Sequence, residues 1–304
     1  MSKIVIIGNS AAGFSCCYAL LSFAPLDEIT VITQEDAFAY DANLLYDFIS
    51  GKLSEKEILL AAEDFYGSPN LRLLKASRVT GINTRKQAVI LKDNNRINYE
   101  YLVIASGKRS VLPDIPGTAK EGVFSFYTLE DARKIRERLA FADTVTVTSD
   151  PLVSLKLSEV FAQKSKHTKV ISAPAPEGFT PSEAVEWIND AQMSEIIGEG
   201  SELKAVKLSN GKAIGTDMVI FTGSYQPSTD FLKDTGIRTQ NGFITVDECF
   251  RTDLENIFAC GSVCQREGNP AQEKSWLDAQ SEGIIVAKNL NESLEGRILT
   301  CPTS

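Results

Sequence analysis

The segment Gly8–Gly13, with the sequence GNSAAG, carries the residue pattern of this chain that is best suited to chemistry. It stands between an apolar, β-branched segment at residues 3–7 and a segment at residues 11–23 with the composition of a helix. Gly8 permits a tight turn, small side chains at 10–12 let the backbone approach a pyrophosphate, and Gly13 lets the helix pack on a sheet. Free N–H groups and the positive end of the helix dipole would then bind the phosphates. The pattern predicts a dinucleotide site at this turn.

Ser10 and Glu35 refine this prediction. Ser10 replaces the middle glycine of the usual G-x-G-x-x-G pattern and is still small. Glu35 lies about 20 residues beyond Gly13, after a β-branched segment at 28–33, where a carboxylate can bind a ribose hydroxyl. The alternative is a strand, turn and helix of small residues with no ligand. The turn alone does not distinguish FAD from NAD.

The cysteines and the single histidine, His167, give no sign of a metal site or a histidine-based catalytic triad. The six cysteines include no C-x-x-C pair and no zinc-type spacing. We interpret them as mainly reduced residues of the protein core. The cysteines are Cys16, Cys17, Cys249, Cys260, Cys264 and Cys301. A redox role for Cys16, Cys17, Cys260 and Cys264 stays open.

Strand-like and helix-like segments alternate along the chain, which is typical of an α/β fold with parallel sheets. After the first strand–helix–strand stretch, a second one begins with a strand at 144–148. We therefore expect two Rossmann-like, three-layer nucleotide-type domains. Further helices are predicted at 54–65, 129–141, 152–163 and 275–290, and further strands at 78–83, 87–91, 97–98, 101–105, 168–172, 203–208, 212–221 and 257–259. Ser54 and Glu57 form a capping-box pattern at the start of the first of these helices.

Composition and charge narrow the classes of function. The 304 residues include 40 acidic and 31 basic ones, for a formal charge of −9, which argues against non-specific nucleic-acid binding. No apolar run approaches the roughly 20 residues that a membrane span needs. The first residues read as a strand rather than a signal peptide, so we expect a cytoplasmic protein.

Four blocks in the order of a known family extend across most of the chain. They are IVIIGNSAAG with Glu35, residues 39–66, YLVIASG at 101–107, and residues 241–263 followed by Trp276, Ala279 and Gly283. The sequence thereby resembles the FAD-dependent pyridine nucleotide-disulfide oxidoreductase family, in particular its NADH:rubredoxin reductase and nitrite-reductase-like branch.

The resemblance implies an FAD domain made of residues 1–110 and 224–304, with an NAD(P)-binding-like domain at 111–223 inserted in it. It also implies which residues lie against FAD. The expected cofactor-binding residues are Gly8, Ser10, Ala11, Ala12, Gly13, Gln34, Glu35, Val79, Ala105, Ser106, Gly107, Gly261, Ser262 and Trp276. Ser262 stands where the family has an aspartate that binds the ribityl chain. The chain ends at Ser304 without the C-terminal interface domain of this branch, so we expect a flavin face open to a partner.

The inserted domain departs from the family at its own phosphate turn. Residues 147–154 read VTSDPLVS and contain no glycine. Pro151 lacks a backbone N–H donor, and Asp150 would repel a pyrophosphate. The following strand ends with neither an acid for a ribose nor an arginine for a 2′-phosphate. We infer that ordinary NAD(P)H binding is lost; the alternative is binding in an unusual mode.

The segment Tyr40–Leu45 lacks the cysteine through which the family's disulfide reductases and peroxidases act, so that chemistry is not expected. Asp41 and Asn43 are possible neighbours of the flavin, or else residues of a solvated loop. No catalytic side chain is assigned, because the redox chemistry would belong to the flavin.

The sequence thus favours an electron-transfer flavoprotein with an iron–sulfur partner, ferredoxin- or rubredoxin-like. Two alternatives stay open. One is an NAD(P)H-dependent flavin or rubredoxin reductase with an atypical nucleotide site. The other is a non-catalytic FAD-binding subunit of a larger redox complex.

Overall fold

The computed structural model describes residues 2–23, 27–174, 182–189, 191–269, 272–297, 299 and 301. The chain divides into two compact units. The first consists of Met1–Asp41, Leu59–Lys108 and Pro227–Ser304, and the second of Ala42–Ile58 and Arg109–Gln226. Residues 42–58 thus group with the second unit. The assignment of 1–110 and 224–304 to FAD, and of 111–223 to a nucleotide-binding-like domain, stays a prediction.

The first unit is built on a parallel sheet of five strands in the order β20-β7-β1-β2-β3. Its β-branched and aliphatic residues are buried because helices and loops cover both faces. The strands are β1 (Lys3–Ile7), β2 (Glu28–Ile32), β3 (Leu71–Leu74), β7 (Tyr101–Ile104) and β20 (Ile257–Ala259). Ile7 and Ala259 are both in register with Ile104, so these three strands end at one edge. Residues that follow them, far apart in the sequence, are brought together there.

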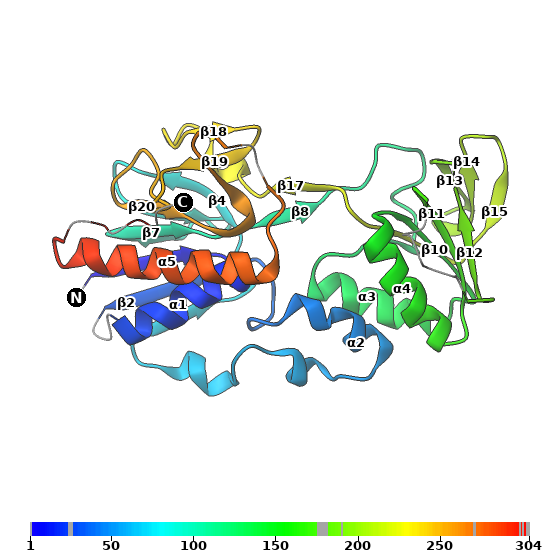
Figure 1. Cartoon of the computed structure of the whole chain (residues 1–304), viewed down its shortest axis with the longest axis horizontal. Coiled ribbons are helices and arrows are strands. Elements are labelled where there is room, and N and C mark those ends of the chain that lie inside the picture. The colour runs from blue at the N-terminus through cyan, green and yellow to red at the C-terminus, as the bar shows by residue number, and fades with distance from the viewer. Residues whose placement is uncertain are drawn as a thin grey trace. The chain divides into compact units, whose positions relative to one another are not determined.

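Two long helices of the first unit, α1 (Ala11–Phe23) and α5 (Trp276–Leu294), pack side by side (Figure 1). Gly283 of α5 makes this approach possible, because a Cβ there would collide with the carbonyl oxygen of Ala12. Helix α5 begins with a capping box in which Ser275 and Asp278 each bind the other's backbone N–H. The C-terminal helix is therefore fixed against the helix that follows the glycine turn.

Smaller elements complete the first unit. Antiparallel strands form one three-stranded sheet, and another includes the parallel pair β19–β21. These strands are β4 (Val79–Asn83), β5 (Ala88–Leu91), β6 (Arg96–Asn98), β18 (Thr239–Gln240), β19 (Phe243–Val246) and β21 (Cys264–Arg266). Short 3-10 turns are η3 (Glu63–Gly67), η4 (Asp230–Leu232) and η5 (Gly261–Val263).

The second unit has its own parallel sheet, in the order β12-β11-β10-β16-β9. Its strands are β9 (Val123–Ser125), β10 (Thr144–Ser149), β11 (His167–Ser172), β12 (Val185–Ile188) and β16 (Met218–Phe221). The unit also holds η1 (Ala42–Leu44), α2 (Leu45–Ser50), η2 (Glu55–Ile58), α3 (Leu129–Leu139), α4 (Pro151–Gln163), and a small antiparallel sheet of β13 (Met193–Glu199), β14 (Glu202–Leu208) and β15 (Ala213–Gly215). Strands β8 (Lys108–Ser110) and β17 (Tyr225–Pro227) pair with each other. The α/β fold expected from the sequence is confirmed.

Three local predictions need correction. The helix expected at 54–65 is absent: the structure has the separate turns η2 and η3, and Leu59 between them pairs with Tyr40 in a β-bridge. The hydrogen bond from Ser54 N–H to Glu57 Oε2 does form, at 2.7 Å. The turn then ends because the backbone of Leu59 and Leu60 pairs with that of residues 39–40. Residues 212–221 form two strands in different sheets, β15 and β16, rather than one.

The third correction concerns two of the six cysteines, because the prediction of mainly reduced core residues is confirmed for the other four. Cys249 and Cys301 form a disulfide, whereas Cys16, Cys17, Cys260 and Cys264 are free and buried. This pair could not be predicted, because disulfide connectivity cannot be deduced from the spacing of cysteines. Within the described ranges, no helix is long and apolar enough to cross a bilayer, and no group of three potential ligands could hold a metal ion.

Candidate functional site

The glycine turn after β1 has a shape that only glycine fits. Gly8 has φ +112°, and a Cβ there would collide with the carbonyl oxygen of Ala105. Its N–H donates to Ile32 O at 2.8 Å, which ties the turn to β2. A Cβ on Gly13 would likewise collide with the carbonyl oxygen of Gly8. The backbone is therefore packed tightly on the protein side of the turn.

The start of α1 keeps its positive end available to a ligand. Ser10 is exposed, whereas Ala11 and Ala12 are buried and add no bulk. The first N–H groups of a helix lack partners within the helix. The first turn of α1 carries no acidic residue that would oppose an anion. A phosphate at this helix end would meet backbone donors and no competing carboxylate.

Asn9 and Tyr66 form a polar contact beside the turn that the sequence analysis missed. Asn9 Nδ2 donates to Tyr66 Oη at 3.3 Å, and the same oxygen accepts the Ala39 N–H at 3.2 Å. Asn9 Oδ1 is buried and has no hydrogen-bond partner among the described residues. A buried acceptor without a partner calls for a donor that a bound ligand or water can supply.

Glu35 is half-buried in the loop after β2, and Gln34 beside it is exposed. Glu35 Oε2 accepts a hydrogen bond from Tyr40 Oη at 2.9 Å. Its backbone is held as well, because its N–H donates to Thr33 Oγ1 at 3.2 Å and its carbonyl accepts from Ala76 N–H. The carboxylate expected to bind a ribose is thus positioned by Tyr40, a residue that was not predicted to have this role.

The glycine motif around Gly261, in the C-terminal third of the chain, lies against the start of α1. Gly261 has φ +76°, and a Cβ on it would lie 2.9 Å from Ala12 Cβ. Cys260 N–H donates to Ile104 O at 3.1 Å, beside the Ala105–Gly107 segment. Three predicted segments therefore meet at one sheet edge. Val79 and Trp276 pack against the core of this unit, and their contact with a cofactor stays a prediction, as does that of Ser262.

Asp41 and Asn43 fall in different units, so their expected position beside the flavin stays a prediction.

Ser106 is half-buried, and its Oγ donates to Ser228 O at 2.8 Å. Gly107 has φ +64°, which makes the bend after β7 easy for glycine.

A buried ion pair lies next to Gly261. Lys274 Nζ is 2.9 Å from Glu282 Oε2, and both side chains are 15% exposed. Burial by itself would lower the pKa of Lys274, but the acidic groups of Cys264 and Glu282 beside it raise that pKa. The sequence analysis missed this pair, although Glu282 directly precedes Gly283 and Lys274 directly precedes the cap of α5.

The free thiols near the turn are protonated at neutral pH. Burial raises the pKa of Cys17 and of Cys264 to about 12. Burial also raises the pKa of Cys16 and of Cys260 well above the usual value. Because the thiolate is the reactive form, these residues are poor nucleophiles, and nothing here supports a redox role for them.

The corresponding turn of the second unit is closed by its own side chain. The G-x-G-x-x-G spacing falls on Ser149, Pro151 and Ser154. Ser149 has φ +99°, a conformation suited to glycine. Asp150 Oδ1 accepts the Val153 N–H at 2.9 Å, so a carboxylate occupies the end of α4 where a phosphate would bind. A Cβ on Gly223 would lie 2.8 Å from Asp150 Cβ, so little space remains above the turn.

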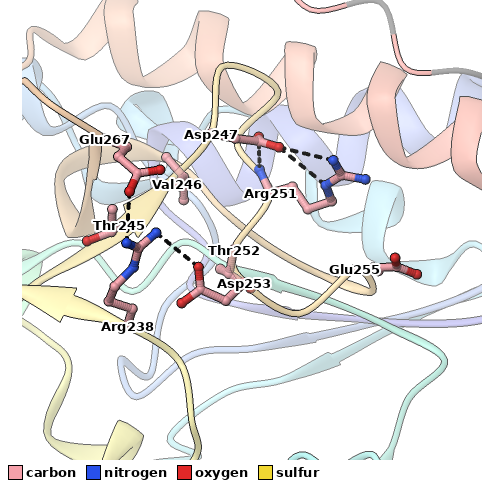
Figure 2. A pocket seen from close by; sticks show the side chains of 9 residues that line it. All are labelled: Arg238, Thr245, Val246, Asp247, Arg251, Thr252, Asp253, Glu255 and Glu267. Atoms are coloured by element: carbon pink, nitrogen blue, oxygen red, sulfur yellow. Dashed lines mark hydrogen bonds and ion pairs between the residues drawn. The ribbon is translucent and has the colours of Figure 1, made fainter.

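A separate cavity of about 260 Å³ lies in the first unit, around β19 and the loop after it (Figure 2). Both arginines that line the cavity form ion pairs with acidic residues that also line it. Arg238 contacts Asp253 at 3.1 Å and Glu267 at 2.8 Å, and Arg251 pairs with Asp247. None of the sequence-predicted site residues lines it.

The first unit combines a tight glycine turn with a second glycine motif packed on it, and the second unit has its own parallel sheet. This arrangement is typical of a two-unit dinucleotide-binding protein. The chain belongs to the pyridine nucleotide-disulphide oxidoreductase family, whose pattern it matches over residues 2–283. Proteins of this family bind FAD, and this chain is an FAD-dependent oxidoreductase. The open start of α1, the glycine-lined turn and the unpartnered Asn9 Oδ1 fit such a cofactor.

Several proteins that are similar to this chain are named as reductases or oxidoreductases. The chain is 28% identical over 277 residues to the NADH-rubredoxin oxidoreductase of Clostridium acetobutylicum, covering 88% of this chain and 70% of that protein. It is 23% identical to human apoptosis-inducing factor 3, and the match extends over 95% of this chain but only 51% of that protein. The covalent putidaredoxin reductase–putidaredoxin complex has the same fold, with a TM-score of 0.88, 21% identity, and coverage of 99% of this chain and 77% of that one. These comparisons do not support the inferred loss of ordinary NAD(P)H binding, which rests on the turn at residues 147–154 of this chain.

Proposed function

We propose that this chain is an electron-transfer flavoprotein that exchanges electrons with an iron–sulfur redox protein, ferredoxin- or rubredoxin-like, without ordinary NAD(P)H binding. When bound, FAD supplies the redox chemistry, since it can take up two electrons and release them singly. No side chain of the protein is then required to form or break a bond.

The residues of the first unit would hold and orient the cofactor. The backbone of Gly8–Gly13 would bind the pyrophosphate, and Glu35, held by Tyr40, would accept a hydrogen bond from a ribose hydroxyl. Gly261 and the Ala105–Gly107 segment would line the part of the cofactor beyond the pyrophosphate. The packing of Gly261 on Ala12 supports this arrangement.

The observation that carries the proposal is the hydrogen bond from Val153 N–H to Asp150 Oδ1 at the start of α4. The end of α1 has no acid in its first turn, whereas α4 is capped by a carboxylate and begins with Pro151. A pyrophosphate at α4 would have to displace Asp150 and would then lie against its negative charge. The first unit is thus suited to a dinucleotide and the second is not.

The names of similar proteins support a protein partner for the electrons. They include an NADH-rubredoxin oxidoreductase, a benzene dioxygenase ferredoxin–NAD(+) reductase subunit of Pseudomonas putida and a reductase bound to putidaredoxin. The same names favour a second candidate function, an NAD(P)H-dependent reductase with an atypical nucleotide site, because two of them contain NADH or NAD(+).

Equilibrium binding separates the two candidates. Titration of the FAD-loaded protein with NADH and with NADPH should give no saturable heat in a calorimeter at millimolar ligand. A variant with Ser149→Gly, Asp150→Gly and Pro151→Ala would restore donors and remove the charge, and it should bind at least one dinucleotide more tightly. Micromolar binding by the unchanged protein would establish the reductase instead.

A further inference from the structure

The ion pair between Lys274 and Glu282 is connected to both backbone polar groups of Gly261. Glu282 Oε2 accepts the Gly261 N–H at 2.8 Å. Lys274 Nζ donates to Gly261 O at 2.9 Å and to Cys264 O at 3.1 Å. The turn η5 is therefore held by two side chains from the start of the α5 region rather than by backbone pairing alone.

This pair lies where three parts of the first unit meet. Gly261 packs on Ala12 Cβ, and Gly283, the residue after Glu282, packs on the carbonyl of Ala12. Ala12 belongs to the first turn of α1, which forms part of the Gly8–Gly13 site. A shift of the Gly261 turn by a fraction of an ångström would consequently reach that site.

The charges of the pair are balanced. Glu282 is a carboxylate directly beside the Gly261 backbone, and at 15% exposure it is poorly shielded by solvent. Lys274 neutralises it with a contact of 2.9 Å. Without the ammonium group, a negative charge would remain at the turn and would repel a diphosphate.

We propose that Lys274 and Glu282 act together as positioning residues for FAD: Glu282 fixes the Gly261 turn against α1, and Lys274 both anchors that turn and cancels the charge of Glu282. The inference rests on FAD binding by the first unit and is independent of the electron donor.

The two single variants are expected to differ. Lys274→Met leaves Glu282 unneutralised, and the dissociation constant of FAD should rise by at least about tenfold. Glu282→Gln keeps an oxygen that can accept the Gly261 N–H and leaves a positive charge, so its effect should be smaller. The double variant Lys274→Met, Glu282→Gln should bind FAD more tightly than Lys274→Met alone. Lys274→Arg, which keeps the charge, should recover most of the affinity.

The measurements are the quenching of FAD fluorescence by apoprotein and, separately, the urea unfolding of the same apoproteins. Arg297→Gln is the control, because it breaks the Arg297–Glu295 pair at the other end of α5 and should not change FAD affinity. An effect on FAD binding in the stated order, larger than the change in apoprotein stability accounts for, supports the proposal.

Lowered apoprotein stability with an unchanged dissociation constant for FAD would show a purely structural pair and overturn it. If Lys274→Met does not fold, Glu282→Gln and Lys274→Arg decide by the same criterion. Failure of the unaltered protein to bind FAD would overturn the cofactor and the positioning role together. Reduction by NADH would overturn only the proposed electron donor and leave the positioning role in place.

Discussion

Gly261 lies directly against Ala12, so close that a Cβ on the glycine would be 2.9 Å from the Cβ of the alanine. This contact joins a motif of the C-terminal third to the first turn of the N-terminal glycine helix. It exists because β1, β7 and β20 end at one edge of a parallel sheet. The cofactor site of the first unit is thus assembled from segments that only the fold brings together.

Gly8→Ala should prevent FAD binding and destabilise the first unit. The added Cβ would meet the carbonyl of Ala105, and φ of +112° is unfavourable for alanine, so we expect a loss of roughly 1–3 kcal/mol. The FAD content of the purified protein and its urea unfolding test this. Gly67→Ala is the matched control, because its Cβ would meet nothing within 4 Å and should leave both quantities nearly unchanged.

Ser149→Gly should stabilise the second unit. Ser149 has φ +99°, and relief of that strain should add about 1 kcal/mol to the free energy of unfolding. Thermal unfolding monitors the change. Ser224→Gly, at an exposed site of the same unit, should instead lower stability slightly, because glycine loses more conformational entropy on folding than serine does. Equal effects at both sites would argue against strain at Ser149.

The disulfide between Cys249 and Cys301 should contribute measurably to stability. It closes a loop that contains the Gly261 turn and α5, and its removal by Cys301→Ser should cost about 2–4 kcal/mol. Urea unfolding with and without dithiothreitol checks this. The reductant should weaken the unaltered protein and leave Cys301→Ser unaffected; equal sensitivity of the two proteins would contradict the pairing.

The buried thiols predict alkaline sensitivity. The pKa of Cys17 and of Cys264 is raised from 9.0 to about 12, so the folded state keeps protons that the unfolded state loses between those values. Their contribution to stability is complete below pH 9 and declines as the pH rises from 9 to 12. Urea unfolding across this range should show the decline. Iodoacetamide should label these thiols only in urea at pH 8, and rapid labelling of the folded protein would refute the raised pKa values.

What the sequence predicted best are features that depend on local pattern. Gly8 and Gly13 were predicted because a glycine turn between strand and helix imposes its own geometry. The α/β class followed from the alternation of strand-like and helix-like segments.

Polar contacts between residues far apart in the sequence were not predicted. Nothing in the sequence indicates that Asn9 contacts Tyr66, or that Lys274 and Glu282 both bind the backbone of Gly261. The failed helix at 54–65 has the same origin, because pairing of Leu59 with Tyr40 overrode a local helical pattern.

The most direct test of the proposed function is stopped-flow absorbance of the FAD-loaded protein, mixed anaerobically with NADH, with NADPH and with reduced ferredoxin or rubredoxin. The self-capped start of α4 predicts rapid bleaching of the flavin by a reduced iron–sulfur protein and slow or no bleaching by either dinucleotide. Rapid bleaching by NADH or NADPH would contradict the proposal and identify a nicotinamide-dependent reductase. No bleaching by any of them would favour a non-catalytic FAD-binding subunit.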